Sequence, residues 1–132
     1  MPQGVGFFGC GWSTPTPFHT PSEAGEEHIA DWLASAHAMV AHCPLLVMVC
    51  HTPPFGTATD VVGSGTHVGS HAVREFIERT QPAVCLTGHI HESRAIDAIG
   101  RTVVVNPGAL VGGGYVRLDL VSGNITARLL SF

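Results

Sequence analysis

Residues 83–92 read AVCLTGHIHE, a mostly apolar run followed by a glycine, two histidines one residue apart and a glutamate. A similar apolar run at residues 45–50 ends at His51. Short apolar runs bounded by glycine or proline indicate buried strands, and the carboxyl ends of parallel strands meet at one edge of a sheet. We therefore expect His51, His89 and His91 to lie at the same edge, where neutral imidazoles are common metal ligands.

The segment before these runs predicts a strand at residues 5–10 and then a helix. We expect the helix to begin at Thr20, because Thr20-Pro21-Ser22-Glu23 combines a capping residue, a proline at the first helical position and a glutamate three residues after the cap. Pro44 ends it. Its expected core face consists of apolar residues at helical spacing, namely Ile29, Trp32, Leu33, Ala36, Met39 and Val40.

The remaining segments complete a mixed α/β pattern. We predict a strand buried on both faces at 45–50, a long functional loop at 52–69, a helix at about 70–80 and a strand at 83–87. Hairpins follow at 94–105 and 115–130, with a glycine-rich flexible link at 112–114. The fold class is α/β, with parallel strands and helices followed by an antiparallel C-terminal meander.

Composition limits the possible partners and the compartment. By length, residues 1–132 make up one domain or less. Only 12% of the residues are charged, against about 25% in an average soluble domain, so the surface is unusually apolar or part of it is covered. A formal charge of −4 does not support nucleic acid binding, and no apolar run reaches the ~18 residues of a membrane span. Four cysteines without Cys-x-x-Cys spacing favour reduced thiols and a cytoplasmic location over disulfides.

Other polar residues receive weaker assignments. The sequence contains neither a Gly-x-x-x-x-Gly-Lys-Ser/Thr phosphate loop nor a Gly-x-Ser-x-Gly nucleophile motif. We interpret Asn106, before Pro107-Gly108, as a turn former that bonds the backbone, and Glu92 as a surface residue or an orienting partner of an imidazole. The histidines outside the trio are treated as solvated helix residues (His28, His37, His42) or as loop residues that could face the site (His19, His67, His71).

Three motifs together resemble the calcineurin-like metallophosphoesterase family. They are His51-Thr52-Pro53-Pro54, Gly88-His89-Ile90-His91-Glu92 and Val105-Asn106-Pro107-Gly108, and the chain is similar to the C-terminal half of such an enzyme. The resemblance implies part of an αββα sandwich with two metal ions at the strand ends. It also implies that His51 and His89 bind the second metal and that His91 binds the first.

The chain departs from the family because it has no counterpart of the family's Asp-x-His, Gly-Asp-x-x-Asp and Gly-Asn-His-Asp elements. The implied function is hydrolysis of phosphomonoesters or phosphodiesters by a metal-bound hydroxide. Manganese, iron, zinc, nickel or cobalt would serve, two ions in a complete family site and at most one here. We expect this chain alone to have little or no activity, and its substrate-binding residues are not readable from the sequence.

A different class of function stays open, in which the chain is a non-catalytic metal-binding module or a subunit completed by another chain. The apolar composition supports this alternative, because strand edges and core faces without cover promote self-association.

Overall fold

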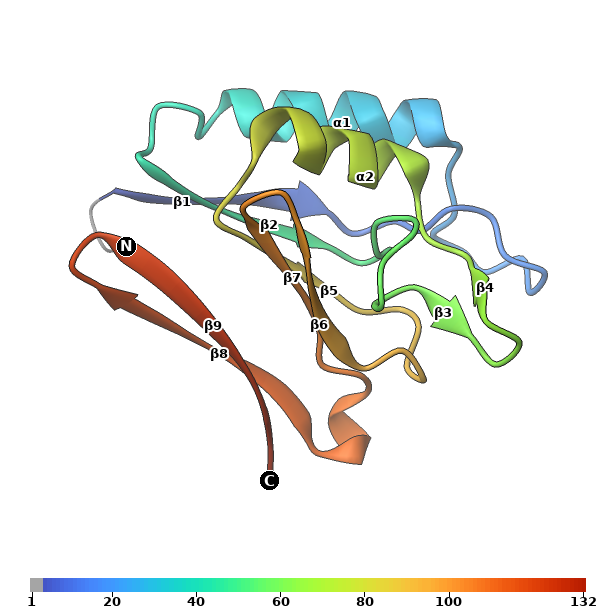
Figure 1. The fold of residues 1–132 in the computed structure, drawn as a ribbon. Coiled ribbons are helices and arrows are strands. Elements are labelled where there is room, and N and C mark those ends of the chain that lie inside the picture. The colour runs from blue at the N-terminus through green and yellow to red at the C-terminus, as the bar shows by residue number, and fades with distance from the viewer. Residues whose placement is uncertain (1–3) are drawn as a thin grey trace.

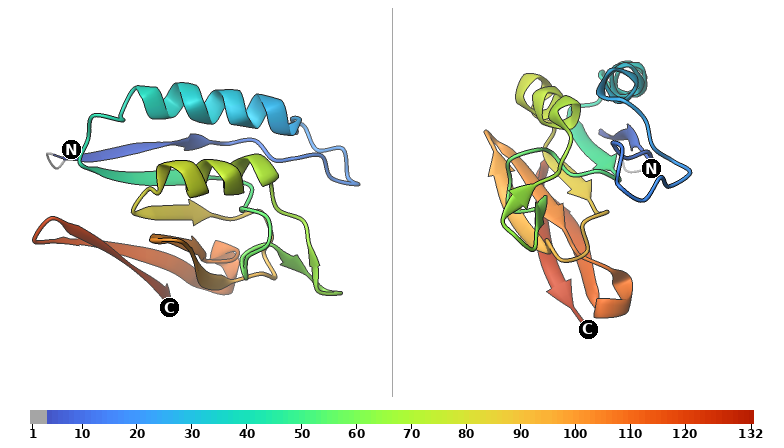
Figure 2. Two further views of the ribbon diagram at one scale, coloured as in Figure 1. Left: turned by 45° about the horizontal axis from the view of Figure 1, so that its top comes forward. Right: turned by 90° about the vertical axis from the view of Figure 1, so that its right-hand side faces the viewer.

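The computed structural model describes residues 4–132 and consists of three layers. A five-stranded sheet forms the middle layer, both helices cover one face, and a two-stranded hairpin lies against the other face (Figure 1). The turned views in Figure 2 show the same arrangement. The predicted α/β class is confirmed, and the described part of the chain contributes one helical layer and two strand layers.

The central sheet contains all the predicted parallel strands. The order across it is β1 (Val5–Cys10), β2 (Leu45–Cys50), β5 (Val84–Thr87), β7 (Thr102–Asn106) and β6 (Ala95–Ile99), and only β6 runs antiparallel to its neighbour. The register places Cys50 beside both Cys10 and Thr87. The loops that follow β1, β2, β5 and β7 therefore emerge at one edge of the sheet.

The first helix begins later than the sequence predicts. Helix α1 spans Glu26–Ala38, and Gly25 is its N-cap. The Oε1 atom of Glu23 accepts the Thr20 amide at 2.9 Å, as in a capping box. However, the backbone at 22–24 pairs with Ser13 in a parallel bridge. Because these residues are extended, the helix begins only at Glu26. The helix ends at Ala38, before Pro44.

Only part of the expected helix face is buried. Ile29 and Leu33 are fully buried against the sheet, whereas Trp32 and Met39 are exposed. Trp32 instead lies against Trp12, with 5.4 Å between ring centroids. Among the described residues, no helix is long and apolar enough to cross a membrane.

The sheet face opposite the helices is incompletely covered, which corrects the prediction of a strand buried on both faces. Strands β8 (Gly114–Val121) and β9 (Asn124–Ser131) form the hairpin on this side, as a sheet separate from the central one. Phe7 and Val49 each remain 47% exposed beside it. An apolar run indicates that both faces of a strand can be buried. Whether both are buried depends on which other segments pack against them.

The C-terminal third contains the two predicted hairpins, but they belong to different sheets. Strands β6 and β7 extend the central sheet, whereas β8 and β9 form their own. The predicted flexible link at 112–114 is ordered, because η1 (Leu110–Gly112) is a 3₁₀ turn and Gly113 adopts a left-handed conformation before β8 begins.

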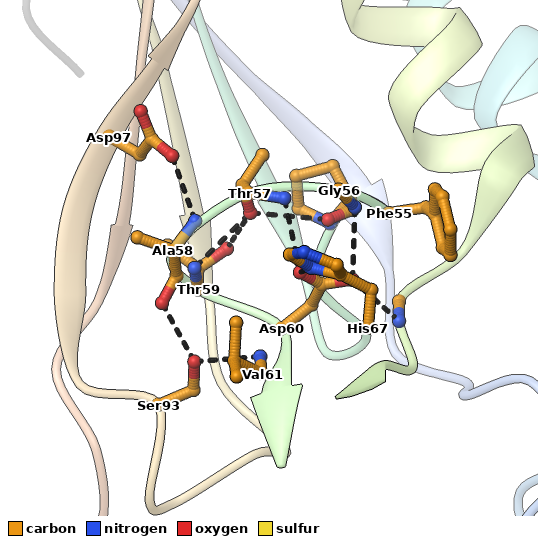
Figure 3. A network of polar contacts seen from close by, with 12 residues as sticks. Phe55, Gly56, Thr57, Ala58, Thr59, Asp60, Val61, His67, Ser93 and Asp97 are labelled. Atoms are coloured by element: carbon orange, nitrogen blue, oxygen red, sulfur yellow. Dashed lines mark hydrogen bonds and ion pairs between the residues drawn. The ribbon is translucent and has the colours of Figure 1, made fainter. Parts of the chain in front are cut away.

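The segment 52–69 is an ordered structure around one buried carboxylate. Asp60 is fully buried and accepts the amides of Gly56, Thr57 and Gly69 at 2.9–3.1 Å. The Nδ1 atom of His67 lies 2.6 Å from Asp60 Oδ1. Figure 3 shows His67 and the backbone of the segment around this carboxylate. Because these partners offset the cost of burying the charge, the segment folds back as a short hairpin, β3 (Val61–Val62) and β4 (Thr66–His67).

Two further side chains attach this segment to its neighbours. Ser93 Oγ donates to the carbonyl of Ala58 and accepts the amide of Val61, and Asp97 accepts the Ala58 amide (Figure 3). The buried amide of Asn106 donates to the carbonyls of Thr59 and Ile90.

Asn106 also confirms its predicted role as a turn former. Its Oδ1 atom accepts the amide of Gly108 at 2.9 Å, which closes the turn after β7. The sequence did not reveal that the same side chain is buried and joins two other loops.

The two helices are connected by a carboxylate at their ends. Helix α2 (His71–Thr80) has Ser70 as its N-cap. Glu26, in the first turn of α1, accepts the amides of His71 and Ala72 and the hydroxyl of Ser70 at 2.6–2.9 Å. A negative charge at the N-terminus of a helix satisfies free amides and is favoured by the helix dipole.

We predict that Glu26→Gln lowers the free energy of unfolding by about 1–2 kcal/mol, because the amide retains fewer of these bonds and lacks the charge. Urea denaturation followed by circular dichroism measures the change. Glu27→Gln is the matched control, since Glu27 is exposed in the same helical turn and its carboxylate lies 4.0 Å from the His28 ring. Equal losses in the two variants would contradict the interhelical role of Glu26.

We predict that Asp60→Asn lowers the free energy of unfolding by about 2–3 kcal/mol, because the Asn side chain cannot accept all of these buried donors. Amide hydrogen exchange should accelerate most at Gly56 and Gly69. Asp97→Asn, which loses one exposed contact, should cost less. Unchanged exchange at both glycines in Asp60→Asn would show that the carboxylate does not hold the segment.

Candidate functional site

The parallel register brings His51 and His89 together. The amide of His51 donates to the carbonyl of Cys10, and the amide of Gly88 donates to the carbonyl of His51, so the ladders continue for one residue beyond the strands. The two imidazoles then face each other, with His51 Nε2 and His89 Nδ1 separated by 2.9 Å. The predicted meeting of these two strand ends at one edge is present in the structure.

A left-handed turn separates His89 from His91. His89 has φ +64°, a conformation that costs a residue with a Cβ about 1–2 kcal/mol. The next residue, Ile90, is buried, and its carbonyl accepts the backbone amide of Ser93 and the side-chain amide of Asn106. His91 follows this anchor and is exposed. The loop therefore aims His89 at His51 and places His91 farther out.

Burial and neighbouring imidazoles lower the pKa of both facing histidines. For His51 the main cause is desolvation, followed by the charge of His91. For His89 it is also desolvation, followed by His51 and His91, while Glu23 acts in the opposite direction. Both side chains are therefore neutral near pH 7, with lone pairs available as acceptors or ligands.

The facing pair fits one side of a transition-metal coordination sphere. Two neighbouring ligands that each lie about 2.1 Å from an ion are separated by roughly 3.0 Å in octahedral geometry and roughly 3.4 Å in tetrahedral geometry, so the observed 2.9 Å is close to the octahedral separation. A hydrogen bond between neutral imidazoles has the same length. Across residues 4–132, no three His, Cys, Asp or Glu side chains come close enough to hold a metal ion together.

Two pockets reach His89 of the histidine pair. A polar one of about 350 Å³ is lined by His51 and His89 together with Ser13, Thr20 and Ser22. A second pocket of about 460 Å³ shares His89 and Thr20 with the first and extends between residues 14–18 and the β3–β4 hairpin. His89 thus lies where these two cavities meet.

The other histidines lie away from this pair. His67 is bonded to Asp60, and His71 stacks on Phe55 with 4.1 Å between ring centroids. His19 is exposed and lines neither adjoining pocket. His37 corrects a prediction, because it packs edge-on against Phe8 instead of being solvated. The structure leaves His28 and His42 exposed, as expected for solvated residues.

Sequence reasoning missed the residues that shape the polar pocket. Glu23 accepts the hydroxyls of Thr16 and Thr20 at 2.6 and 2.8 Å, and these bonds lower its pKa to about 2. The capping-box pattern identified the contact with Thr20 but assigned it to a helix start. Glu92 is exposed and lines the second pocket, of about 460 Å³.

All four cysteines are free in the structure. Desolvation raises the pKa of the Cys50 thiol to about 12 and that of Cys85 well above its ordinary value. These two side chains therefore act as small apolar groups in the core.

Comparison with known proteins identifies relatives that are about twice as long. The chain is 42% identical over 109 residues to the uncharacterized protein MJ1162 of Methanocaldococcus jannaschii, covering 80% of this chain and 49% of the relative. It is 27% identical over 129 residues to UPF0046 protein K07C11.7 of Caenorhabditis elegans, covering 98% of this chain and 42% of the relative. The chain thus spans about half the length of the curated relatives that it matches.

Solved structures show the same fold. One crystal structure superimposes with a TM-score of 0.68 at 27% identity, covering 96% of this chain and 49% of the other. The structure of TT1561 from Thermus thermophilus gives a TM-score of 0.55 at 20% identity, covering 94% of this chain and 52% of the other.

The family model described as metallophosphoesterase, calcineurin superfamily, matches residues 40–129. This range includes both facing histidines, His91, the Asp60 segment and Asn106. Since it spans more than half of the chain, the chain belongs to the calcineurin-superfamily metallophosphoesterases.

Proposed function

We propose that His51, His89 and His91 form the metal-binding part of a phosphoesterase site that hydrolyses phosphomonoesters or phosphodiesters. The observation that carries the proposal is the pair of imidazole nitrogens 2.9 Å apart at neighbouring strand ends. Membership of the metallophosphoesterases supports the reaction type.

In this proposal the chain's own residues hold the ion and the phosphoryl group. His51 and His89 would ligate a divalent metal, and His91 would contribute from the outer side of the loop. Ser13 and Ser22 line the polar pocket beside them, and their hydroxyls would donate hydrogen bonds to phosphate oxygens. When bound, a divalent metal supplies Lewis-acid activation of water and of the phosphoryl oxygens.

The donor set limits what this chain does by itself. Three imidazoles without a bridging carboxylate support at most one ion, because two-metal sites depend on shared ligands. We therefore expect little or no turnover of aryl phosphate esters by the 132-residue chain, and the activity of a complete family domain stays a proposal. Manganese, iron, zinc, nickel and cobalt are the candidate ions.

We predict that the chain binds one zinc or nickel ion weakly in titration calorimetry. His51→Ala and His89→Ala should each lower the affinity at least about tenfold, and His91→Ala should lower it less, because His91 lies outside the facing pair. His42→Ala, at an exposed position after α1, is the control. Unchanged binding in all three site variants would place the metal elsewhere.

The same titration has a pH dependence of defined sign. Because the pKa values of His51 and His89 are lowered, both imidazoles stay neutral to a lower pH than an ordinary histidine. Affinity should therefore hold down to about pH 6.5 and fall below it, as protons compete for the same lone pairs.

A second candidate function is a module completed by another protein surface, and the incompletely covered sheet face favours it. Besides Phe7 and Val49, this face contains an apolar pocket of about 160 Å³ between the central sheet and the hairpin, lined by Val5, Phe7, Val47, Leu118, Leu120 and Ile125. A larger cavity of about 610 Å³ on the same side reaches His51.

This candidate predicts that the chain self-associates to cover the exposed face, because burying apolar surface stabilises an interface. Sedimentation velocity should show concentration-dependent oligomers, and Phe7→Ser should weaken them. Phe18→Ser, which removes a more exposed phenylalanine elsewhere, is the control. A monomer at every concentration that does not bind an apolar dye would count against the candidate.

A further inference from the structure

The second pocket beside the histidine pair has apolar walls from two separate segments. Residues 14–18 contribute Pro15, Pro17 and Phe18, and the hairpin side contributes Val62 and Val68. Phe18 is 82% exposed, so its ring is available to a ligand.

Both walls are held in place by hydrogen bonds to residues that do not line the pocket. Glu23 fixes Thr16 and Thr20 on one side. On the other side, the amide of Val68 donates to the carbonyl of Asp60, and the amide of Val61 donates to Ser93 Oγ. A pocket whose walls are preformed loses little entropy when a ligand enters.

The charge on the pocket decides the chemistry of its ligand. Among the described residues that line it, Glu92 is the only Asp, Glu, Lys or Arg, so this lining offers no cation to a second phosphate. This disfavours nucleotides with polyphosphate chains and nucleic acids, whose binding depends on Lys and Arg. An uncharged apolar group, above all an aromatic ring that packs on proline and phenylalanine, fits the lining.

The two adjoining pockets are placed to bind different parts of one substrate. Because His89 and Thr20 line both, a group bound at the histidine pair continues directly into the apolar cavity. We propose that this cavity binds the aromatic organic group of a phosphate ester whose phosphoryl group lies at His51 and His89. The assignment rests on the proposed phosphoesterase function and adds the substrate class.

The test compares two non-hydrolysable probes, 1-naphthylphosphonate and methylphosphonate, in calorimetry and in amide NMR titrations with zinc present. The naphthyl compound should bind at least about tenfold more tightly, since each roughly 55 Å² of apolar surface removed from water raises affinity about tenfold. Its largest shifts should occur at Phe18, Val62 and Val68.

Matched variants locate the effect. Phe18→Ser and Val68→Asp should each reduce the ratio of naphthylphosphonate affinity to methylphosphonate affinity toward one. Phe132→Ser should preserve it, because Phe132 is similarly exposed, at 86%, but lies at the end of the β8–β9 hairpin.

The outcomes separate this inference from the proposed function. Equal affinities for the two phosphonates, or naphthyl shifts confined to the β8–β9 side of the sheet, would overturn the substrate assignment. A naphthyl advantage that persists without zinc and in His51→Ala and His89→Ala would keep the apolar pocket and overturn the phosphoesterase site. Loss of both probes in the histidine variants, with the naphthyl advantage intact in the parent chain, supports both.

Discussion

The side-chain amide of Asn106 holds together three segments that surround the histidine pair. Its donors bind the carbonyls of Thr59 and Ile90, and its acceptor binds the amide of Gly108. All three bonds are made by one buried group, so each segment that moves leaves a polar atom unsatisfied in the interior. The turn that presents His89 is consequently coupled to the segment around Asp60 and to the end of β7, and the edge of the sheet behaves as one unit.

The sheet and its functional edge were predictable because their signals are local or follow from parallel topology. The run at 45–50 and the turn at Gly88 specify strand ends, and parallel pairing places His51 beside Gly88. The start of α1 was not predictable in the same way. Glu23 makes the contact that a capping box requires, and only the pairing of its backbone with Ser13, a residue ten positions away, shows that the chain is extended there.

The candidate site was predictable in part. The sequence predicted that His51 and His89 lie together, which the structure shows. The exposed position of His91 depends on the left-handed backbone at His89, a conformation that favours glycine and that a histidine in the sequence does not indicate. The structural role of Asp60 was not predicted, because its partners are mostly backbone amides, which every sequence has. The apolar pocket is likewise a product of tertiary structure, since residues 14–18 and the β3–β4 hairpin show no relation in the sequence.

The carboxylate of Glu26 has a consequence for how the helical layer forms. It belongs to α1, yet its hydrogen bonds are made to the first turn of α2. A helix of ten residues such as α2 is below the length at which an isolated helix persists in water. Its first turn is completed by a side chain of α1. The stability of α2 therefore depends on α1 being in place, and a local opening that separates the two helices removes the cap of α2.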